Sequence, residues 1–283
     1  MFDPGQTGFV NYNTCLPSGQ QLQNMAYSTI MVENIGFIGT GIIASAIVTG
    51  FCEKTENKRI FLSPRNAEKA AALAKAHKNV TVCESNQEVL DKSDWVLISL
   101  LPAHAKDEIK KLKFSPGHKV LNVTAGASLE EIAGIIGTTK LLCHLLPLPF
   151  IREGYGPVAL FPENKEAVEL LKPVADVVVT KSMKTIKSFQ ALTGLMSAIN
   201  MLLYEFVEFS KKEETSEEEA RAYVASFLSA LGRQSASYPG SLHELANEMT
   251  PGGLNEQALN YVTEHDGIKT FIDILTPLLK RIS

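Results

Sequence analysis

The sequence lacks a cysteine cluster, a long apolar run and an excess of positive charge. Its four cysteines are scattered and form no Cys-x-x-Cys pair. A disulfide framework or a zinc site is therefore not expected, and the thiols indicate a reducing, cytoplasmic compartment. No apolar stretch approaches the roughly 20 residues that span a bilayer. The formal net charge of -4 disfavours nucleic acid or an anionic membrane surface as a partner.

The first thirty residues contain neither lysine nor arginine and are rich in Gln, Asn, Gly and Ser. They match neither a secretory signal, which needs a basic start and an apolar centre, nor an arginine-containing transit peptide. A segment this polar cannot bury enough apolar surface to offset the entropy lost on ordering. We therefore predict that residues 1–30 are a disordered extension or an upstream remnant and that the folded protein opens at Met31.

From Asn34 onward, short apolar runs alternate with amphipathic stretches, as in βαβ units that form a parallel sheet covered on both faces. From about Lys184 the apolar period is helical throughout. The predicted strands are 35–38, 59–62, 80–82, 95–98, 120–123, 158–161 and 177–179. The predicted helices are 42–53, 66–77, 85–91, 104–112, 188–211, 215–235, 241–248, 253–265 and 268–282.

A glycine turn, Gly39-Thr40-Gly41, follows the first predicted strand and opens a helix, giving the pattern Gly-x-Gly-x-x-Ala that ends at Ala44. In dinucleotide-binding proteins the first glycine allows the tight turn and the second lets the backbone approach the pyrophosphate. The helix N-terminus adds N–H groups and a partial positive charge. A glycine turn without a ligand is the alternative, but the strand-turn-helix context favours a pyrophosphate site.

The end of the second predicted strand selects the nucleotide. Proteins that prefer NAD usually carry Asp or Glu there, whereas this chain has Ser63-Pro64-Arg65-Asn66. Arg65 attracts a 2′-phosphate and can bind it through two N–H groups, while Ser63 and Asn66 add neutral donors. We therefore predict NADP(H) as the cofactor. The alternative makes Arg65 a solvated surface residue and Asn66 a helix N-cap.

These motifs, in order and spacing over about residues 33–283, resemble the pyrroline-5-carboxylate reductase family. The most specific match is Met249-Thr250-Pro251-Gly252-Gly253. In the family, the corresponding Pro-Gly-Gly element closes the imine site. Residues 100–102 resemble the strand-end turn of the family, and residues 124–126 resemble its Ala-Gly loop. The resemblance implies a Rossmann domain, a helical dimerisation domain and intertwined dimers that are often assembled into rings.

The predicted fold class is therefore α/β: a Rossmann-type, doubly wound and mostly parallel sheet followed by an all-helical dimerisation domain. We assign residues 31–184 to the NADP-binding domain and residues 185–283 to the helical domain, which also contributes to substrate binding.

The substrate half departs from the family pattern. The Lys-Pro turn of the family is Leu101-Pro102 here, and its Met-Pro-Asn stretch appears as Leu146-Pro147-Leu148. Its Gly-Ser-Gly segment is represented only by residues 192–197, and the threonine pair after the two glycines is Leu254-Asn255. These departures leave open which imine the protein reduces.

The resemblance implies NADPH-dependent reduction of a cyclic imine, in which a hydride passes to the C=N carbon and gives a proline-type product. Thr250 and Asn255 are the predicted catalytic residues, and Gly252, Gly253 and Thr193 are the predicted substrate-binding residues. The predicted partners are a small imine and at least one further copy of the chain, and no metal is expected. The predicted cofactor-binding residues are Gly36, Gly39, Thr40, Gly41, Ile42, Ile43, Ser63, Arg65, Asn66, Leu100, Leu101, Pro102, Ala125 and Gly126.

Two other functions stay open. One is an NADP-binding regulator with reduced catalysis. The other is an enzyme similar to β-hydroxyacid dehydrogenases, which rely on a lysine of the long interdomain helix, for which Lys187 is the nearest candidate. His144, in the apolar run 141–146, is either a proton donor near the nicotinamide or a satisfied buried residue. We adopt the buried interpretation.

Overall fold

A single mixed sheet organises the first part of the chain. The computed structural model describes residues 32–124, 126 and 128–282, so the prediction for residues 1–30 lies outside the described residues. Eight strands follow the order β3-β2-β1-β4-β5-β6-β7-β8, and all pair in parallel except β6 with β7. The strands are β1 (Glu33–Ile38), β2 (Lys58–Leu62), β3 (Val80–Val82), β4 (Trp95–Ile98), β5 (Lys119–Asn122), β6 (Leu141–Leu146), β7 (Pro157–Phe161) and β8 (Asp176–Val179).

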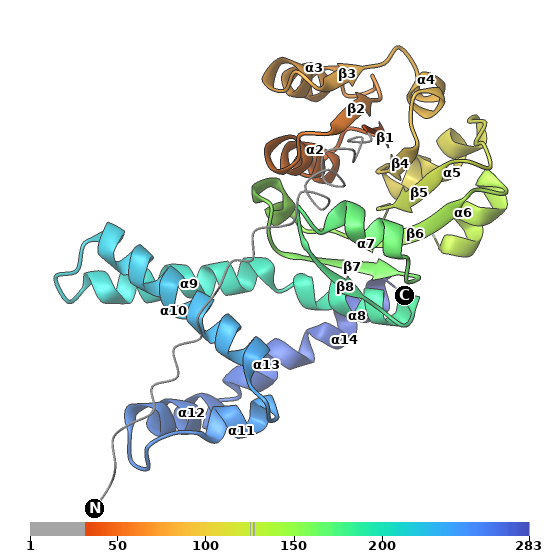
Figure 1. Ribbon diagram of the computed structural model, residues 1–283. Helices are drawn as coiled ribbons and strands as arrows, with labels where there is room; N and C mark the ends of the chain where they lie inside the picture. Colours follow the sequence, from red (N-terminus) through yellow and green to blue (C-terminus); the bar gives the residue numbers. More distant parts are fainter. Residues whose placement is uncertain (1–31, 125, 127, 283) are drawn as a thin grey trace, which may run out of the picture.

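Helices cover both faces of this sheet (Figure 1). Alternate strand residues feed two cores, with Phe37 of β1 in one and Ile38 in the other. The predicted doubly wound, mostly parallel fold is therefore confirmed. The first core is covered by α2 (Ile42–Lys54), α3 (Ala67–Ala76), the 3₁₀ turn η1 (Pro149–Glu153) and α7 (Lys165–Leu171). The second is covered by α4 (Asn86–Asp91), α5 (Pro102–Lys110) and α6 (Leu129–Ile136).

The sequence analysis did not predict β6, α6 or α7. The run 141–146 was treated only as an apolar stretch, although its alternate residues Cys143 and Leu145 face the first core and Leu142 packs against the second. A strand buried on both faces carries no polar alternation, and this is why its period gave no signal.

From α8 onward the described residues form helices only. They are α8 (Met183–Thr193), α9 (Met196–Lys211), α10 (Glu217–Ser237), α11 (Leu242–Asn247), α12 (Leu254–Glu264), α13 (Gly267–Asp273) and α14 (Leu275–Ile282). Ser216 caps α10 in a capping box with Glu219. No helix within the described part of the chain combines the length and the apolarity needed to cross a membrane.

The prediction of one long helix over 188–211 is wrong, because the chain bends between α8 and α9. The N–H of Gly194 bonds to the carbonyl of Ala191 at 3.1 Å, so an i→i−3 bond replaces the helical i→i−4 bond. A Cβ on Gly194 would lie 3.0 Å from Cδ1 of Leu278. The glycine therefore lets α14 pack against the bend.

The predicted helix 268–282 is likewise divided into α13 and α14. Pro277 lies in the first turn of α14, where its missing N–H and its ring are incompatible with a helix that continues through Asp273. The proline thus ends one helix and is tolerated at the start of the next.

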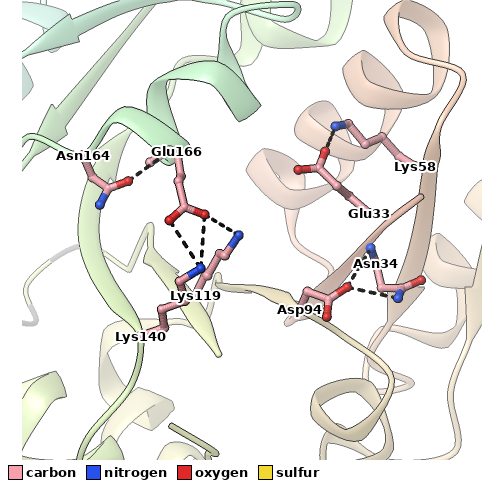
Figure 2. A network of polar contacts seen from close by, with 9 residues as sticks. Glu33, Asn34, Lys58, Asp94, Lys119, Lys140, Asn164 and Glu166 are labelled. Atoms are coloured by element: carbon pink, nitrogen blue, oxygen red, sulfur yellow. Dashed lines mark hydrogen bonds and ion pairs between the residues drawn. The ribbon is translucent and has the colours of Figure 1, made fainter. Parts of the chain in front are cut away.

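The amino ends of the strands are joined by charged and polar contacts (Figure 2). Lys58 of β2 pairs with Glu33 of β1. The amide of Asn34 donates to Asp94 Oδ2 at 3.1 Å, and Glu166 of α7 lies 2.5 Å from the Lys119 ammonium group. These side chains bridge neighbouring elements at this edge, whereas the opposite edge holds the features described next.

Candidate functional site

The loop between β1 and α2 is held by the end of β2. Gly39 has φ near +100°, and a Cβ there would lie 2.2 Å from the carbonyl oxygen of Ser99, so a side chain cannot be accommodated. The Gly39 N–H donates to Ser63 Oγ at 2.8 Å, and the Thr40 hydroxyl donates to the Ser63 carbonyl at 3.2 Å. Ser63 is 0% exposed. It therefore braces the loop, which corrects its predicted role as a direct donor to the nucleotide.

Asn66 is a second brace on the same loop. Its side-chain amide donates to the carbonyl of Thr40 at 3.1 Å, and it makes no capping hydrogen bond although it precedes α3. The side chain of Asn66 therefore does not cap α3, and the N–H that it donates to the Thr40 carbonyl is not available to a nucleotide. Arg65, next to it in the chain, is exposed, so its guanidinium is accessible to a ligand.

The outer side of the loop is open. A Cβ on Gly41 would meet no atom within 4 Å, so the missing side chain leaves space that packing does not need. Ile42 is 71% exposed, and the first turn of α2 carries no acidic residue. Unpaired N–H groups at the start of a 13-residue helix favour an anion. The loop therefore fits a diphosphate held by backbone amides.

Gly36 serves a different purpose from the other glycines. It lies inside β1, where a Cβ would come within 2.4 Å of Ser93 Oγ and 2.7 Å of Val89 Cγ1. Its missing side chain lets α4 and the residue after its end pack closely on the sheet. This corrects the prediction that Gly36 binds the cofactor.

The ends of β4 and β5 lie next to each other. The N–H of Leu100 donates to the Thr124 hydroxyl oxygen at 3.3 Å, and Leu101 is 71% exposed. Pro102 is the first residue of α5. Gly126 has φ near +75°, and a Cβ added to it would lie 3.8 Å from the Cβ of Pro102. These predicted residues therefore meet at one edge, while Ala125 lies outside the described residues.

Asn122, the last residue of β5, pairs in the sheet with His144 of β6. Asn122 is 0% and His144 6% exposed, and their side-chain atoms Nδ2 and Nδ1 are 3.1 Å apart. Burial lowers the pKa of His144 to about 4. His144 is therefore buried, as predicted, and it also lines the cavity described next. The sequence analysis missed Asn122, whose signal was a lone amide at the end of an apolar strand.

A cavity of about 520 Å³ lies beside this pair. Both the loop after β5 and helices α6, α8 and α14 contribute to its wall. Within the described residues, no group of three or more His, Cys, Asp or Glu side chains is placed to hold a metal ion. The lining residues are Gly126, Ser128, Glu130, Glu131, His144, Met183, Ile186, Lys187, Gln190 and Ile282.

Residues 34–126, which contain the glycine loop, match the family model described as NADP oxidoreductase, coenzyme F420-dependent. The pyrroline-5-carboxylate reductase of Aquifex aeolicus is 21% identical over 246 residues, which cover 84% of this chain and 92% of the relative. Pyrroline-5-carboxylate reductase 2 of Bacillus subtilis is 20% identical over 264 residues, covering 88% and 94%. Both relatives are pyrroline-5-carboxylate reductases, and the chain is similar to them over most of its length.

Solved structures of pyrroline-5-carboxylate reductases share the fold of this chain. The enzyme from Streptococcus pyogenes superposes with a TM-score of 0.74 at 20% identity, covering 88% of this chain and 97% of the other. The Plasmodium falciparum pyrroline carboxylate reductase, solved with NADP bound, gives 0.74 at 15% identity, with 89% and 97% covered. The Rossmann sheet and the following helices therefore have the arrangement seen in that family.

The Pro-Gly-Gly element of this chain lies far from the glycine loop of the same copy (Figure 1). Figure 1 places α11 and α12 at the opposite end of the molecule from β1 and β2, and neither helix has a buried residue. Thr250, Gly252 and Asn255 are exposed. One copy does not bring these predicted residues to the cofactor loop, because the intervening helices lead away from the sheet.

The backbone N–H groups of Gly252 and Gly253, two of the predicted substrate-binding residues, are already bonded within the chain. The N–H of Gly252 donates to Glu256 Oε2 at 2.6 Å, and the N–H of Gly253 donates to the Thr250 carbonyl at 2.8 Å. Glu256 is four residues after Gly252 in the first turn of α12, where the helix dipole favours an acid. That spacing was the signal that the sequence analysis missed.

Thr193 lies at the end of α8, and its hydroxyl donates to the carbonyl of Gln190 at 2.9 Å. It lines a second cavity, of about 210 Å³, which is otherwise apolar. Thr193 is therefore separated from the other predicted substrate residues, and it contributes the only polar side chain to that wall among the described residues. The apolar lining residues are Leu146, Leu148, Pro157, Ala159, Val178, Phe189 and Leu192.

Replacing Ser63 tests the brace on the loop. In Ser63→Ala the buried N–H of Gly39 loses its acceptor, and we expect the free energy of unfolding to fall by about 1–3 kcal/mol. The matched control is Ser45→Ala, because the Gly41 carbonyl that accepts the Ser45 hydroxyl also accepts the Ser45 N–H at 2.9 Å. We expect the control to cost less than about 1 kcal/mol in urea unfolding. Equal losses in the two variants would contradict the brace.

Proposed function

We propose that this protein is an NADPH-dependent reductase of a cyclic imine and that it works as a homodimer with a composite active site. The observation that carries the proposal is the braced glycine loop, open over Gly41, in a chain whose relatives over most of its length are pyrroline-5-carboxylate reductases. The substrate is an imine whose contacts differ from those of the relatives, since the loop and helix motifs of the substrate half have changed.

The residues at the carboxyl edge fit a dinucleotide phosphate. The amides of Thr40 to Ile42 and the N-terminus of α2 suit the diphosphate. Arg65, which is exposed, suits the 2′-phosphate, and no acidic residue stands at the end of β2 to repel it. Leu101, Pro102 and Gly126 form the edge along which the rest of the cofactor would extend.

Imine reduction requires little acid–base machinery from the protein. When bound, the nicotinamide supplies the hydride that ends on the imine carbon. The nitrogen of the imine can carry its proton before binding, so the chain needs chiefly to hold and orient the substrate. A cavity whose histidine is neutral is therefore compatible with catalysis.

The helical part requires a second copy to cover it. The arm formed by α9 and α10 extends away from the sheet (Figure 1), and its side chains include Met201, Tyr204 and Phe209, which are 60%, 54% and 66% exposed. Monomeric proteins rarely leave such an apolar surface uncovered. A symmetric partner that covers this arm would also carry its own Pro-Gly-Gly element toward the cavity of the first copy.

A second candidate function rests on Lys187. The sequence analysis weighed a β-hydroxyacid dehydrogenase-like reaction that needs a lysine on the interdomain helix, and Lys187 of α8 lines the same cavity as His144 and Gly126. An open-chain hydroxy acid is therefore the competing substrate class. The substrate panel below separates the two.

The role of Arg65 is tested by binding. In Arg65→Ser we expect the Kd for NADPH to rise about 10–100-fold through loss of charge-assisted hydrogen bonds, with no change for NADH. The control is Arg59→Ser, which replaces an exposed arginine near the start of β2 and should leave the binding of both nucleotides unchanged. The fluorescence of NADPH and of NADH measures the Kd of each nucleotide for the two variants and for the wild type. Equal weakening of NADH and NADPH would refute 2′-phosphate recognition by Arg65.

The substrate class is tested by NADPH consumption. We expect turnover with five- or six-membered cyclic imines, offered with and without a carboxylate, and none with open-chain hydroxy acids in the presence of NADP. The control is the Gly41→Val variant, in which the new side chain enters space that is empty in the fold and should abolish NADPH binding without unfolding the protein. Turnover confined to hydroxy acids would establish the second candidate.

The composite site is tested by complementation between two inactive variants. One copy carries Gly41→Val, and the other carries Thr250→Val with Asn255→Leu. A heterodimer purified through two different tags contains one intact composite site, and we expect about half of the wild-type activity per dimer. The two parent homodimers serve as controls. An inactive heterodimer would mean that both halves of each site come from one copy.

A further inference from the structure

The polar pair of Asn122 and His144 interrupts two apolar strands. Both side chains are on the sheet face that α6 covers, because Val120 and Leu142, two residues earlier in each strand, pack in that core. Burying an amide and an imidazole there is costly unless their polar atoms are bonded. The contact between them, 3.1 Å from Asn122 Nδ2 to His144 Nδ1, supplies one such bond.

A backbone group fixes which way the pair is bonded. The N–H of Thr124 donates to Asn122 Oδ1 at 3.1 Å, so the oxygen of the amide faces Thr124 and the nitrogen faces His144. An amide nitrogen can only donate, and Nδ1 of His144 must therefore accept. The imidazole is consequently neutral and carries its proton on Nε2, in agreement with the lowered pKa that burial gives it.

The other edge of the ring belongs to the cavity. His144 lines it together with Gly126 and Gln190, and among the described residues the ring makes its one recorded hydrogen bond at Nδ1. Three charged side chains line the same wall: Glu130 and Glu131 of α6 and Lys187 of α8. Glu131 is paired with Lys106 and accepts the N–H of Ser128.

We propose that His144 is a neutral hydrogen-bond donor, through Nε2–H, to a carboxylate oxygen of the substrate, and that Asn122 is the positioning residue that keeps the proton on that nitrogen. The proposal rests on the proposed function, since it names what the cavity recognises in the imine. His144 thus binds the substrate carboxylate, which the Gly252 N–H cannot bind while it donates to Glu256. Lys187 adds positive charge on the same wall.

The tautomer can be tested without turnover. Imidazole ¹⁵N spectra of the full-length protein, with the His144 signals identified by their loss in His144→Gln, should show a neutral ring protonated on Nε2 from about pH 5.5 to 8. In Asn122→Asp the carboxylate accepts from Nδ1 instead, so the proton should move there and the pKa of His144 should rise. A proton on Nδ1 in the wild type, or titration near the unperturbed pKa, would overturn the role of Asn122.

Recognition of the carboxylate can be tested by binding. Calorimetry with tetrahydro-2-furoic acid, a stable cyclic carboxylic acid, should show about 5–30-fold weaker binding to His144→Leu and Asn122→Asp through loss of one hydrogen bond to a charged group. His144→Gln, which keeps an N–H donor, should recover part of the loss. The control is His118→Gln, a buried histidine that accepts the Ser115 N–H at Nδ1 and is outside the lining residues of the cavity. Unchanged binding by His144→Leu would overturn the proposal.

Kinetics separate this proposal from the proposed function. For a cyclic imine with a carboxylate, His144→Leu should raise KM with a smaller effect on kcat. For the cyclic imine without a carboxylate, both constants should change little. Equal effects on both imines would show that His144 is only structural. If the wild type reduces neither imine, the proposed function fails, while the spectra and the calorimetry still decide the state and the role of His144.

Discussion

The hydrogen bond from the Gly39 N–H to Ser63 Oγ, 2.8 Å long, joins the ends of β1 and β2. A glycine at φ near +100° has little to hold it in place, because it has no side chain to pack. A fully buried hydroxyl at the end of the next strand supplies that restraint, and the amide of Asn66 adds a second one at Thr40. Ser63 and Asn66, which follow β2, thus hold the loop through their side chains, and the part of the loop after Gly39 can face outward.

The two edges of the sheet are built with different chemistry. The amino edge is joined by ion pairs, such as Lys119 with Glu166, whose charges lie at least partly in solvent. The carboxyl edge is joined by neutral groups: Ser63, Asn66, Thr124 and the pair of Asn122 and His144. Because the braces of the glycine loop are neutral, the charge of a phosphate bound at this loop is met by backbone amides and by Arg65. This division matches the general rule that ligands of open α/β sheets bind at the carboxyl ends of the strands.

The parts of the fold that sequence alone predicted are those with local signals. Gly39 and Gly41 indicated the loop because they lie between an apolar strand and a helix. The alternation from β1 to β5 was predicted from apolar runs separated by amphipathic stretches. The strand β6 was not predicted, because burial on both faces removes the alternation of polar and apolar residues. The bend at Gly194 depends on Leu278, some eighty residues away, and the bond between Asn122 and His144 depends on strand register; neither is a property of a local window. The role of Ser63 was misjudged for the same reason, since only the packed structure shows that its hydroxyl is consumed by Gly39.

The Pro-Gly-Gly element shows how a motif can persist while its chemistry changes. Gly252 keeps the left-handed φ, near +73°, that turns its N–H toward the start of α12, and an anion there is stabilised by the helix dipole. In this chain the anion is the Glu256 carboxylate, 2.6 Å from that N–H. An external carboxylate would have to displace a tethered one, and a tethered group has the higher effective concentration. Recognition of an acidic substrate therefore shifts toward groups that the chain leaves unsatisfied, and the imidazole N–H at the wall of the cavity is such a group. Under the proposed function, a carboxylate bound at His144 rather than at the Pro-Gly-Gly turn would also set the position of the ring that must face the nicotinamide.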